Sequence, residues 1–330
     1  NIDYIELDDI VPNPRLSKVY EGIEICKKEN INFILAVGGG SVIDTAKAIG
    51  AGACMKEDFW DLQLGKTPFS GKSLEIGVIL TYPATGSEMN TSCVITNDKT
   101  LIKKGSNLTH PTFSILNPEL CRYLPKNRIA QGVVDMLAHA MERYFTNTKN
   151  VELTDRLLEG VMKTIVHLGP KWFLSGYDYD IVSELMYSAT VAHNFSLCVG
   201  RENDFSSHRI GHGLSALYDL AHGESLSIIF PSWFRFVRNH NKERIAQFFI
   251  KVFNVEPNYL NLDDTIDMGI KTLEEFYTKL EMPIKISQSN IRDFDVDKTI
   301  EAATLNGSLE IGHYVKLSQS DIKEILLNSI

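Results

Sequence analysis

The chain has 330 residues, of which 44% are hydrophobic and 23% charged, a composition typical of a globular protein with two domains. Its formal net charge is −9 and it contains no block of Lys or Arg, which argues against nucleic acid as a partner, because neutralising phosphates requires a basic surface. The longest apolar runs, such as residues 33–37, are too short to cross a bilayer, so we expect a small-molecule ligand and no membrane partner.

The first 120 residues alternate short β-rich runs with patterns of helical period. Strands are expected at residues 4–7, 32–37 and 74–80, and helices at 15–29 and 42–52. Strands separated by helices of this length form βαβ units with a parallel sheet. Residues 1–124 should therefore form an α/β, Rossmann-like domain. It should end within LNPELCRYLP, where two prolines interrupt the pattern.

A glycine turn follows the strand expected at 32–37. Gly38, Gly39, Gly40 and Ser41 precede a helix, so backbone N–H groups and the positive end of the helix dipole meet at one point. Such a point suits a pyrophosphate, although a tight turn that needs positive φ explains the same glycines equally well. The motif is not a P-loop, because no Lys follows, and this disfavours an ATP-hydrolysing site.

A second loop, rich in hydroxyl groups, follows the strand expected at 74–80. It contains Thr81, Thr85 and Ser87. Ligands of open α/β sheets bind beyond the carboxyl ends of the strands, so the loops after both strands should face the same ligand. Taken singly, Thr85 and Ser87 are more often turn or helix-capping residues.

Beyond Pro125 the pattern changes to apolar residues spaced three and four apart, with few β-branched runs. Helices are expected at 126–146, 151–168, 181–198, 205–217 and 242–253. Residues 125–330 should therefore form an all-helical domain.

The five cysteines are scattered and include no C-x-x-C pair. They are Cys26, Cys54, Cys93, Cys121 and Cys198. This odd number without paired spacing predicts neither a disulfide framework nor a thiolate metal site, and it suits a reducing cytoplasm.

Histidines are concentrated in one stretch of the helical domain. HRIGHGLSALYDLAH, residues 208–222, contains three of the nine histidines. His208 and His212 are four residues apart and project from one face of a helix, and Asp135 and His139 have the same spacing upstream. Side chains from facing helices commonly build metal sites in helical proteins.

A metal ion shared by His208 and His222 requires the helix to end between them. Fourteen helical residues would otherwise separate them by about 21 Å. The segment YDLAHGES offers such a break, and the candidate ligands are then Asp135, His139, His208 and His222. Three imidazoles and one carboxylate suit Fe²⁺ or Zn²⁺, with Ni²⁺ or Co²⁺ as substitutes in vitro. One isolated pair would more often be a core or surface feature, but two pairs together with His222 favour a metal site.

His212 is left over from this ligand set, one helical turn from His208. A role as general acid/base near pH 7 and a purely structural role at a cleft wall are both compatible with its spacing. The remaining histidines have no neighbours of this kind and are interpreted as structural or surface residues: His110, His167, His193, His240 and His313.

Seven motifs along the chain together resemble those of the iron-containing (group III) alcohol dehydrogenases, in particular the NADPH-dependent butanol and short-chain aldehyde branch. They are VPNPRLSKVYEGIEIC, AVGGGSVIDTAKAI, TYPATGSEMN, VITND, PTFSILNPEL, LPKNRIAQGVVDMLAHAMERYF and HRIGHGLSALYDLAHGESLSII. The resemblance implies a dehydroquinate-synthase-like architecture, with an α/β nucleotide domain, a helical metal domain and the active site between them.

The resemblance also implies the role of each site residue by its position in these motifs. The metal ligands fall on Asp135, His139, His208 and His222, the histidine near substrate and nicotinamide on His212, the diphosphate turn on Gly38, Gly39, Gly40 and Ser41, and the nicotinamide loop on Thr81, Thr85 and Ser87. The implied enzyme is cytoplasmic and interconverts short-chain primary alcohols and aldehydes, as butanol dehydrogenases do. It should prefer NADP(H) over NAD(H) and Fe²⁺ over Zn²⁺, and form a homodimer through the first domain.

Several departures from the family pattern bear on substrate and cofactor preference. Asn117 stands in place of a usual Asp, Gly213 in place of a frequent Glu, and Phe205 in place of a frequent Trp. Similar proteins begin with an additional strand and helix whose glycine/serine turn helps to select NADP. The first domain is expected to lack this strand and helix, which would expose a sheet edge and weaken nucleotide binding.

Two alternative functions stay open. A lyase, or a polyol or sugar-phosphate dehydrogenase, would use the same metal cradle, because a fold alone does not determine the reaction. Such an enzyme should have several basic residues near the histidines to bind a substrate phosphate, and the sequence shows none. A non-catalytic nucleotide-binding or assembly protein is the other alternative, against which the intact ligand residues argue.

Overall fold

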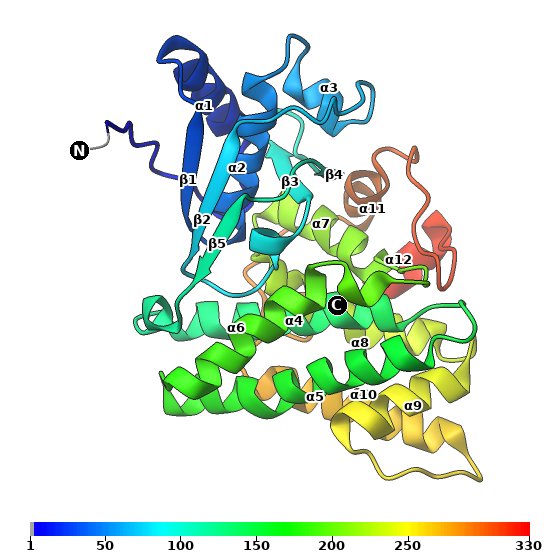
Figure 1. Ribbon diagram of the computed structural model, residues 1–330. Coiled ribbons are helices and arrows are strands. Elements are labelled where there is room, and N and C mark those ends of the chain that lie inside the picture. Colours follow the sequence, from blue (N-terminus) through cyan, green and yellow to red (C-terminus); the bar gives the residue numbers. More distant parts are fainter. Residues whose placement is uncertain (1–2) are drawn as a thin grey trace. The chain divides into compact units, whose positions relative to one another are not determined.

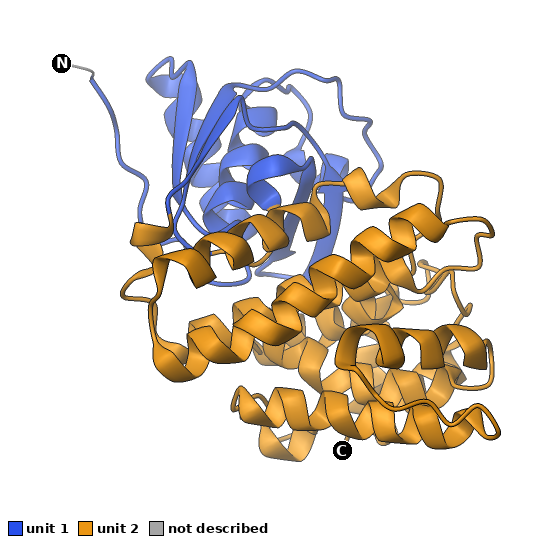
Figure 2. Cartoon of the chain, turned by 60° about the horizontal axis from the view of Figure 1, so that its bottom comes forward, with its two compact units in different colours: residues 1–82, 87–117 blue, residues 83–86, 118–330 orange. Residues whose placement is uncertain are grey.

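A computed structural model describes residues 3–330, which divide into two compact units (Figures 1 and 2). The N-terminal unit contains the described residues up to Tyr82 together with Ser87–Asn117. The helical unit contains Pro83–Gly86 and Pro118–Ile330.

The N-terminal unit is built around a parallel sheet with the strand order β1-β2-β5. Its elements are α1 (Leu16–Lys28), β1 (Phe33–Gly38), α2 (Gly40–Ala53), α3 (Phe59–Gln63), β2 (Glu75–Leu80), η1 (Ser87–Met89), β3 (Ser92–Asn97), β4 (Ile102–Asn107) and β5 (Phe113–Leu116). Val37 is in register with Ile79, and Gly38 with Leu80, so β1 and β2 end at the same edge of the sheet. The α/β fold with a parallel sheet is thus confirmed.

Two features of the N-terminal unit differ from the sequence-based expectations. Residues 4–7 form no strand, because this stretch pairs with no other strand in the described chain, although its residues alternate in polarity. Strands β3 and β4 form an antiparallel hairpin that was not predicted. Strand β4, with the sequence IKKGSN, lacks the apolar alternation by which a half-buried strand is recognised.

Helices α1 and α2 pack closely against each other through glycines. A Cβ at Gly22 would lie 2.2 Å from Cδ1 of Ile49, and a Cβ at Gly52 would lie 2.3 Å from Cδ1 of Ile23. Their buried apolar side chains form the core of this unit together with side chains of β3 and α3. Helix α2 also contacts β1, and the glycine turn joins these two elements. The packing of α2 therefore determines where the turn lies.

The helical unit contains nine α-helices and three short 3₁₀ turns among its described residues, and it confirms the expected all-helical second part. These are η2 (Pro118–Cys121), α4 (Lys126–Tyr144), α5 (Glu152–Ser175), α6 (Tyr179–His193), η3 (Ser196–Cys198), α7 (Ser206–Tyr218), α8 (His222–Val237), α9 (Lys242–Phe253), α10 (Leu262–Lys279), η4 (Ile286–Gln288), α11 (Val296–Thr304) and α12 (Gln319–Leu327). None of the helices in residues 3–330 combines the length and apolar character that crossing a membrane requires.

Helix α4 is the central helix of this unit. It contacts α5, α6 and α8, and every residue from Ile129 to Tyr144 is buried. The buried face includes the polar side chains Asp135, His139 and Glu142. Polar groups are rarely buried without partners, because their desolvation costs free energy, so this helix needs compensating groups around it.

The boundary between the units falls at Asn117–Pro118, seven residues before the expected boundary at residue 124. The η2 turn contacts α6, and the Arg122 guanidinium lies 4.8 Å from the centre of the Tyr177 ring, so residues 118–124 pack with the helices. The short segment Pro83–Gly86, expected in the first domain, also groups with the helical unit.

Candidate metal centre

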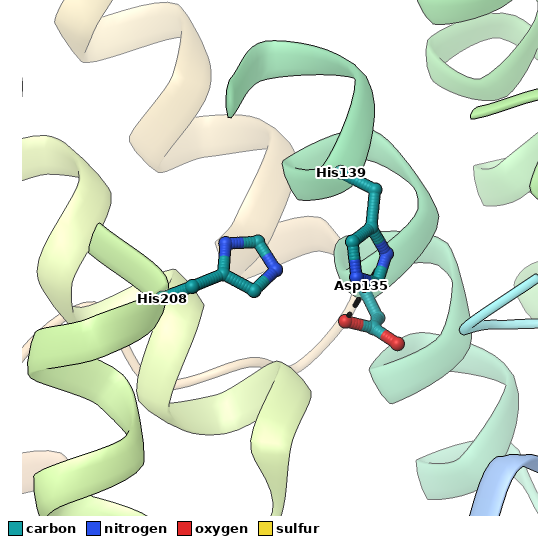
Figure 3. A group of neighbouring side chains, drawn as sticks. All are labelled: Asp135, His139 and His208. Carbon is teal, nitrogen blue, oxygen red and sulfur yellow. Dashed lines mark ion pairs between the residues drawn. The ribbon is translucent and has the colours of Figure 1, made fainter. Parts of the chain in front are cut away.

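Asp135, His139 and His208 place ligand atoms within 4.8 Å of one another. Asp135 and His139 lie one turn apart on α4, and Figure 3 shows the ring of His208, from α7, directed toward them. All three side chains are buried. His139 Nδ1 and Asp135 Oδ1 are 3.6 Å apart, which is too long for a hydrogen bond. Three potential ligands thus surround one point in the interior of the helical unit.

His222 lies next to this group because the expected helix break is present. Helix α7 ends at Tyr218, Asp219 adopts a φ of 51°, and α8 begins at His222. The ring centroids of His208 and His222 are therefore only 5.2 Å apart. His222 Nε2 lies 3.6 Å from Asp135 Oδ1, and at 22% its side chain is the most exposed of the four predicted ligands.

The four side chains fit a divalent metal ion. Nδ1 of His139 is buried and has no hydrogen-bond partner within residues 3–330, a situation that costs about 1–3 kcal/mol if nothing binds it. Burial, reinforced by neighbouring His193 and His208, holds the pKa of His139 well below its usual range, so its imidazole is neutral and has a lone pair for a cation. Three imidazoles and one carboxylate match the preferences of Fe²⁺ and Zn²⁺.

Glu142 is a polar residue of this centre that the sequence analysis missed. Its Oε1 accepts a hydrogen bond from the backbone N–H of His208 at 2.9 Å and lies 2.8 Å from Nδ1 of the same residue. Burial raises the pKa of Glu142 to about 8, and the hydrogen bond from the His208 backbone opposes this shift. Residues 135, 139 and 142 lie on one helix face, so their spacing contained a signal that could have identified Glu142.

His193 also lies closer to the centre than its sequence context indicated. Its ring centroid is 4.0 Å from that of His139, with the rings inclined by 34°. His193 therefore has a neighbour that the sequence did not show, and its interpretation as a structural or surface residue stays a prediction. The contact joins the end of α6 to the middle of α4, and no local spacing could have revealed it.

His212 lies beside the predicted ligand His222. Its ring centroid is 5.3 Å from that of His222, and the residue is partly exposed. The next residue, Gly213, packs against α11, where a Cβ would lie 2.8 Å from the backbone oxygen of Thr299. Close helix packing thus explains why glycine occupies position 213.

In the N-terminal unit the glycine turn lies next to Thr81, the first residue of the second predicted cofactor loop, whereas Thr85 of that loop belongs to the helical unit. The backbone N–H of Thr81 donates to the carbonyl oxygen of Gly38 at 3.1 Å, just beyond the ends of β1 and β2. Gly39 forms the N-cap of α2, which begins at Gly40 and includes Ser41 in its first turn.

Close packing explains the first two glycines of the turn. None of the three glycines has a positive φ, so that alternative explanation is wrong. A Cβ at Gly38 would lie 2.5 Å from Cγ2 of Val42, and one at Gly39 would lie 3.0 Å from Cβ of Tyr82.

Ser87 belongs to a buried polar network that anchors the second loop. Its Oγ donates to Asp44 Oδ1 at 2.6 Å and accepts from Lys47 Nζ at 2.9 Å. The fully buried Lys47 ammonium also donates to the carbonyl oxygens of Asn90 and Ser92, at 2.8 and 3.0 Å. Burial raises the pKa of Asp44 and lowers that of Lys47. Contacts of Thr81, Thr85 and Ser87 with a cofactor stay predictions. Thr81 and Thr85 are partly exposed, and Ser87 is buried.

Comparison with protein families gives two matches that together span nearly the whole chain. The profile described as "Iron-containing alcohol dehydrogenase" matches residues 1–118, and the one described as "Fe-containing alcohol dehydrogenase family, C-terminal" matches residues 129–330.

Individual relatives agree with these matches. The chain is 39% identical to a Bacillus subtilis protein named probable NADH-dependent butanol dehydrogenase 1, over 98% of this chain and 84% of the relative. It is 31% identical to the NADPH-dependent aldehyde reductase YqhD of Escherichia coli, over 94% of this chain and 81% of that protein. The crystal structure of NADH-dependent butanol dehydrogenase A from Thermotoga maritima superimposes with a TM-score of 0.94, at 36% identity over 99% of this chain and 84% of the other.

Proposed function

The chain belongs to the iron-containing alcohol dehydrogenase family, and from this premise we propose that Asp135, His139, His208 and His222 hold one catalytic divalent metal ion. The protein is an oxidoreductase of the alcohol dehydrogenase and aldehyde reductase type that uses a nicotinamide cofactor. We propose short-chain primary alcohols and aldehydes, such as butanol and butyraldehyde, as its substrates, and Fe²⁺ as its preferred metal.

The observation that carries this proposal is the convergence of Asp135, His139 and His208 in the interior of the helical unit. Burial of a carboxylate costs free energy unless an opposite charge compensates it, and a cation bound among these side chains would supply that charge. A metal ion held by these residues would supply Lewis-acid chemistry at the substrate oxygen, and a bound nicotinamide would supply or accept the hydride.

The side chains of this protein supply the remaining steps. Burial keeps His139 neutral, as a ligand must be. We assign proton transfer to His212, which stands beside His222 at the more exposed side of the cluster and can exchange protons with solvent.

Replacing His212 with Ala is expected to lower turnover by about 100-fold while leaving the metal in place, because general acid/base groups contribute about 10² to 10⁴ in rate. The measurements are kcat and the metal content of the same sample. His167→Ala is the matched control, since His167 lies on the exposed side of α5. Unchanged turnover in His212→Ala, or loss of the metal, would contradict this role.

The proposed activity is tested by stripping the purified chain of metal, adding back Fe²⁺ or Zn²⁺ under anaerobic conditions, and following NADH and NADPH oxidation separately with butyraldehyde. The expected result is aldehyde-dependent oxidation that requires the metal. Binding of nucleotide without turnover, under either metal, would instead support the non-catalytic alternative.

The same assay addresses the choice of nicotinamide. The sequence-based preference for NADPH stays a prediction, because the named relatives include both NADH-dependent and NADPH-dependent proteins. The ratio of kcat/KM for the two cofactors measures this preference directly. A cytoplasmic location and a homodimer also stay predictions, and light scattering of the purified protein tests the second.

A further inference from the structure

Glu142 is not one of the four candidate ligands, but its carboxyl group contacts one of them, His208. We propose that Glu142 is a positioning residue that fixes the ring orientation and tautomer of His208, and thereby sets the affinity of the centre for its metal ion. This inference rests on the proposed metal centre and extends it to a fifth side chain.

The first argument is the geometry of the contact. One carboxylate oxygen, Oε1 of Glu142, contacts both the backbone nitrogen of His208 at 2.9 Å and its ring Nδ1 at 2.8 Å. These two contacts hold the main chain and the ring of His208 together, which restricts rotation of the side chain. With Nδ1 engaged by Glu142, Nε2 is the ring nitrogen that remains to serve as a metal ligand.

The second argument is the rigidity of Glu142 itself. It is 1% exposed and lies in the buried part of α4, which also carries Asp135 and His139. Its backbone oxygen accepts a hydrogen bond from the backbone N–H of Asp204 at 2.9 Å. The Asp204 carboxylate in turn accepts hydrogen bonds from the backbone and hydroxyl of Ser206 at the start of α7. The helices carrying the ligands are thus tied together at Glu142.

The third argument is chemical. A metal ion on Nε2 of His208 requires the ring proton to be on Nδ1, and a carboxylate at position 142 accepts a hydrogen bond from that N–H. With a divalent cation on His208, the Glu142 carboxyl would be ionised despite its burial, and its negative charge would make the imidazole a better electron donor, as in carboxylate–histidine–metal arrangements generally. A glutamine at this position would accept from the His208 backbone, but its amide group could also donate to Nδ1 and so favour the tautomer that cannot bind metal.

The test is the affinity of the full chain for Zn²⁺, measured by competition with a chromogenic chelator. Glu142→Gln is expected to weaken Zn²⁺ binding by about 10-fold to 100-fold, the usual effect of losing such a partner. The visible absorption spectrum of the Co²⁺ form should also change, because the ring of His208 is no longer held in one orientation.

Glu159→Gln is the matched control. Glu159 is also buried, but it lies on α5, where Oε1 accepts from the Tyr144 hydroxyl and from Nε2 of Gln247, both at 2.8 Å. This variant should bind Zn²⁺ with wild-type affinity, even if its stability falls. It therefore separates a general effect of losing a buried carboxylate from an effect on the metal centre.

Glu142→Asp provides a second variant if Glu142→Gln does not fold. It keeps the charge but withdraws the carboxylate by one methylene, so its affinity for Zn²⁺ should fall between those of wild type and Glu142→Gln. Wild-type affinity in either folded variant would overturn the positioning role. If wild type itself binds Zn²⁺ no more tightly than His208→Ala, the proposed metal centre is wrong, and that outcome is distinct from the first.

Discussion

Replacing His208 with Ala is expected to abolish metal retention. His208 is a candidate ligand from α7 that meets Asp135 and His139 of α4 at one buried point, so the substitution removes the ligand that α7 contributes. Loss of a group that only hydrogen-bonds to a ligand typically lowers the affinity for the metal 10-fold to 100-fold. Loss of a ligand itself should lower this affinity further. Metal-dependent turnover should fall with the metal content.

The measurements are the metal content after desalting, by mass spectrometry, and the dissociation constant for Zn²⁺. Circular dichroism checks folding, because this variant also deprives Glu142 of its contact with Nδ1. His167→Ala again serves as the histidine control. If His208→Ala retains metal with wild-type affinity, the assigned ligand set is wrong.

Replacing Lys47 with Met is expected to destabilise the N-terminal unit by about 3–5 kcal/mol. The substitution removes the ammonium from a fully buried network and leaves the Asp44 carboxylate without that compensating charge. Removal of one member of a buried charged pair typically costs this much. The loop that contains Ser87 and Asn90 also loses its hydrogen bonds from the Lys47 ammonium, so nucleotide binding should weaken as well.

The free energy of unfolding is measured by urea denaturation. Hydrogen exchange of peptides from α2 and β3 reports the unfolding of the N-terminal unit. Lys28→Met is the control, because its ammonium is on the surface, where substitutions usually change stability by no more than about 0.5 kcal/mol. A loss of less than about 1 kcal/mol in Lys47→Met would show that the network contributes little.

The regular alternation of strand and helix was sufficient to predict the parallel sheet and the helical second part. The same patterns failed where structure depends on a distant partner. Residues 4–7 alternate in polarity, yet they form no strand, since a strand also requires a neighbour to pair with. The hairpin β3–β4 was missed because the pattern of β4 is mostly polar, and its stability comes from pairing with β3.

The candidate site shows the same division between local and distant information. The i, i+4 spacing found Asp135 with His139, and the need for a break before His222 predicted a turn that the structure contains. The contact of His193 with His139 depends on how two helices pack, so no spacing could reveal it. Glu142 has the helical spacing that places it on the same face as Asp135 and His139, but spacing alone does not reveal that its side chain contacts His208 of another helix.

The most direct test of the metal centre is anomalous X-ray diffraction from crystals of the Zn²⁺-loaded protein, recorded at the zinc absorption edge. We expect an anomalous peak about 2.0–2.2 Å from ligand atoms of Asp135, His139, His208 and His222. A fully loaded protein whose anomalous peak lies away from these four side chains would contradict this expectation.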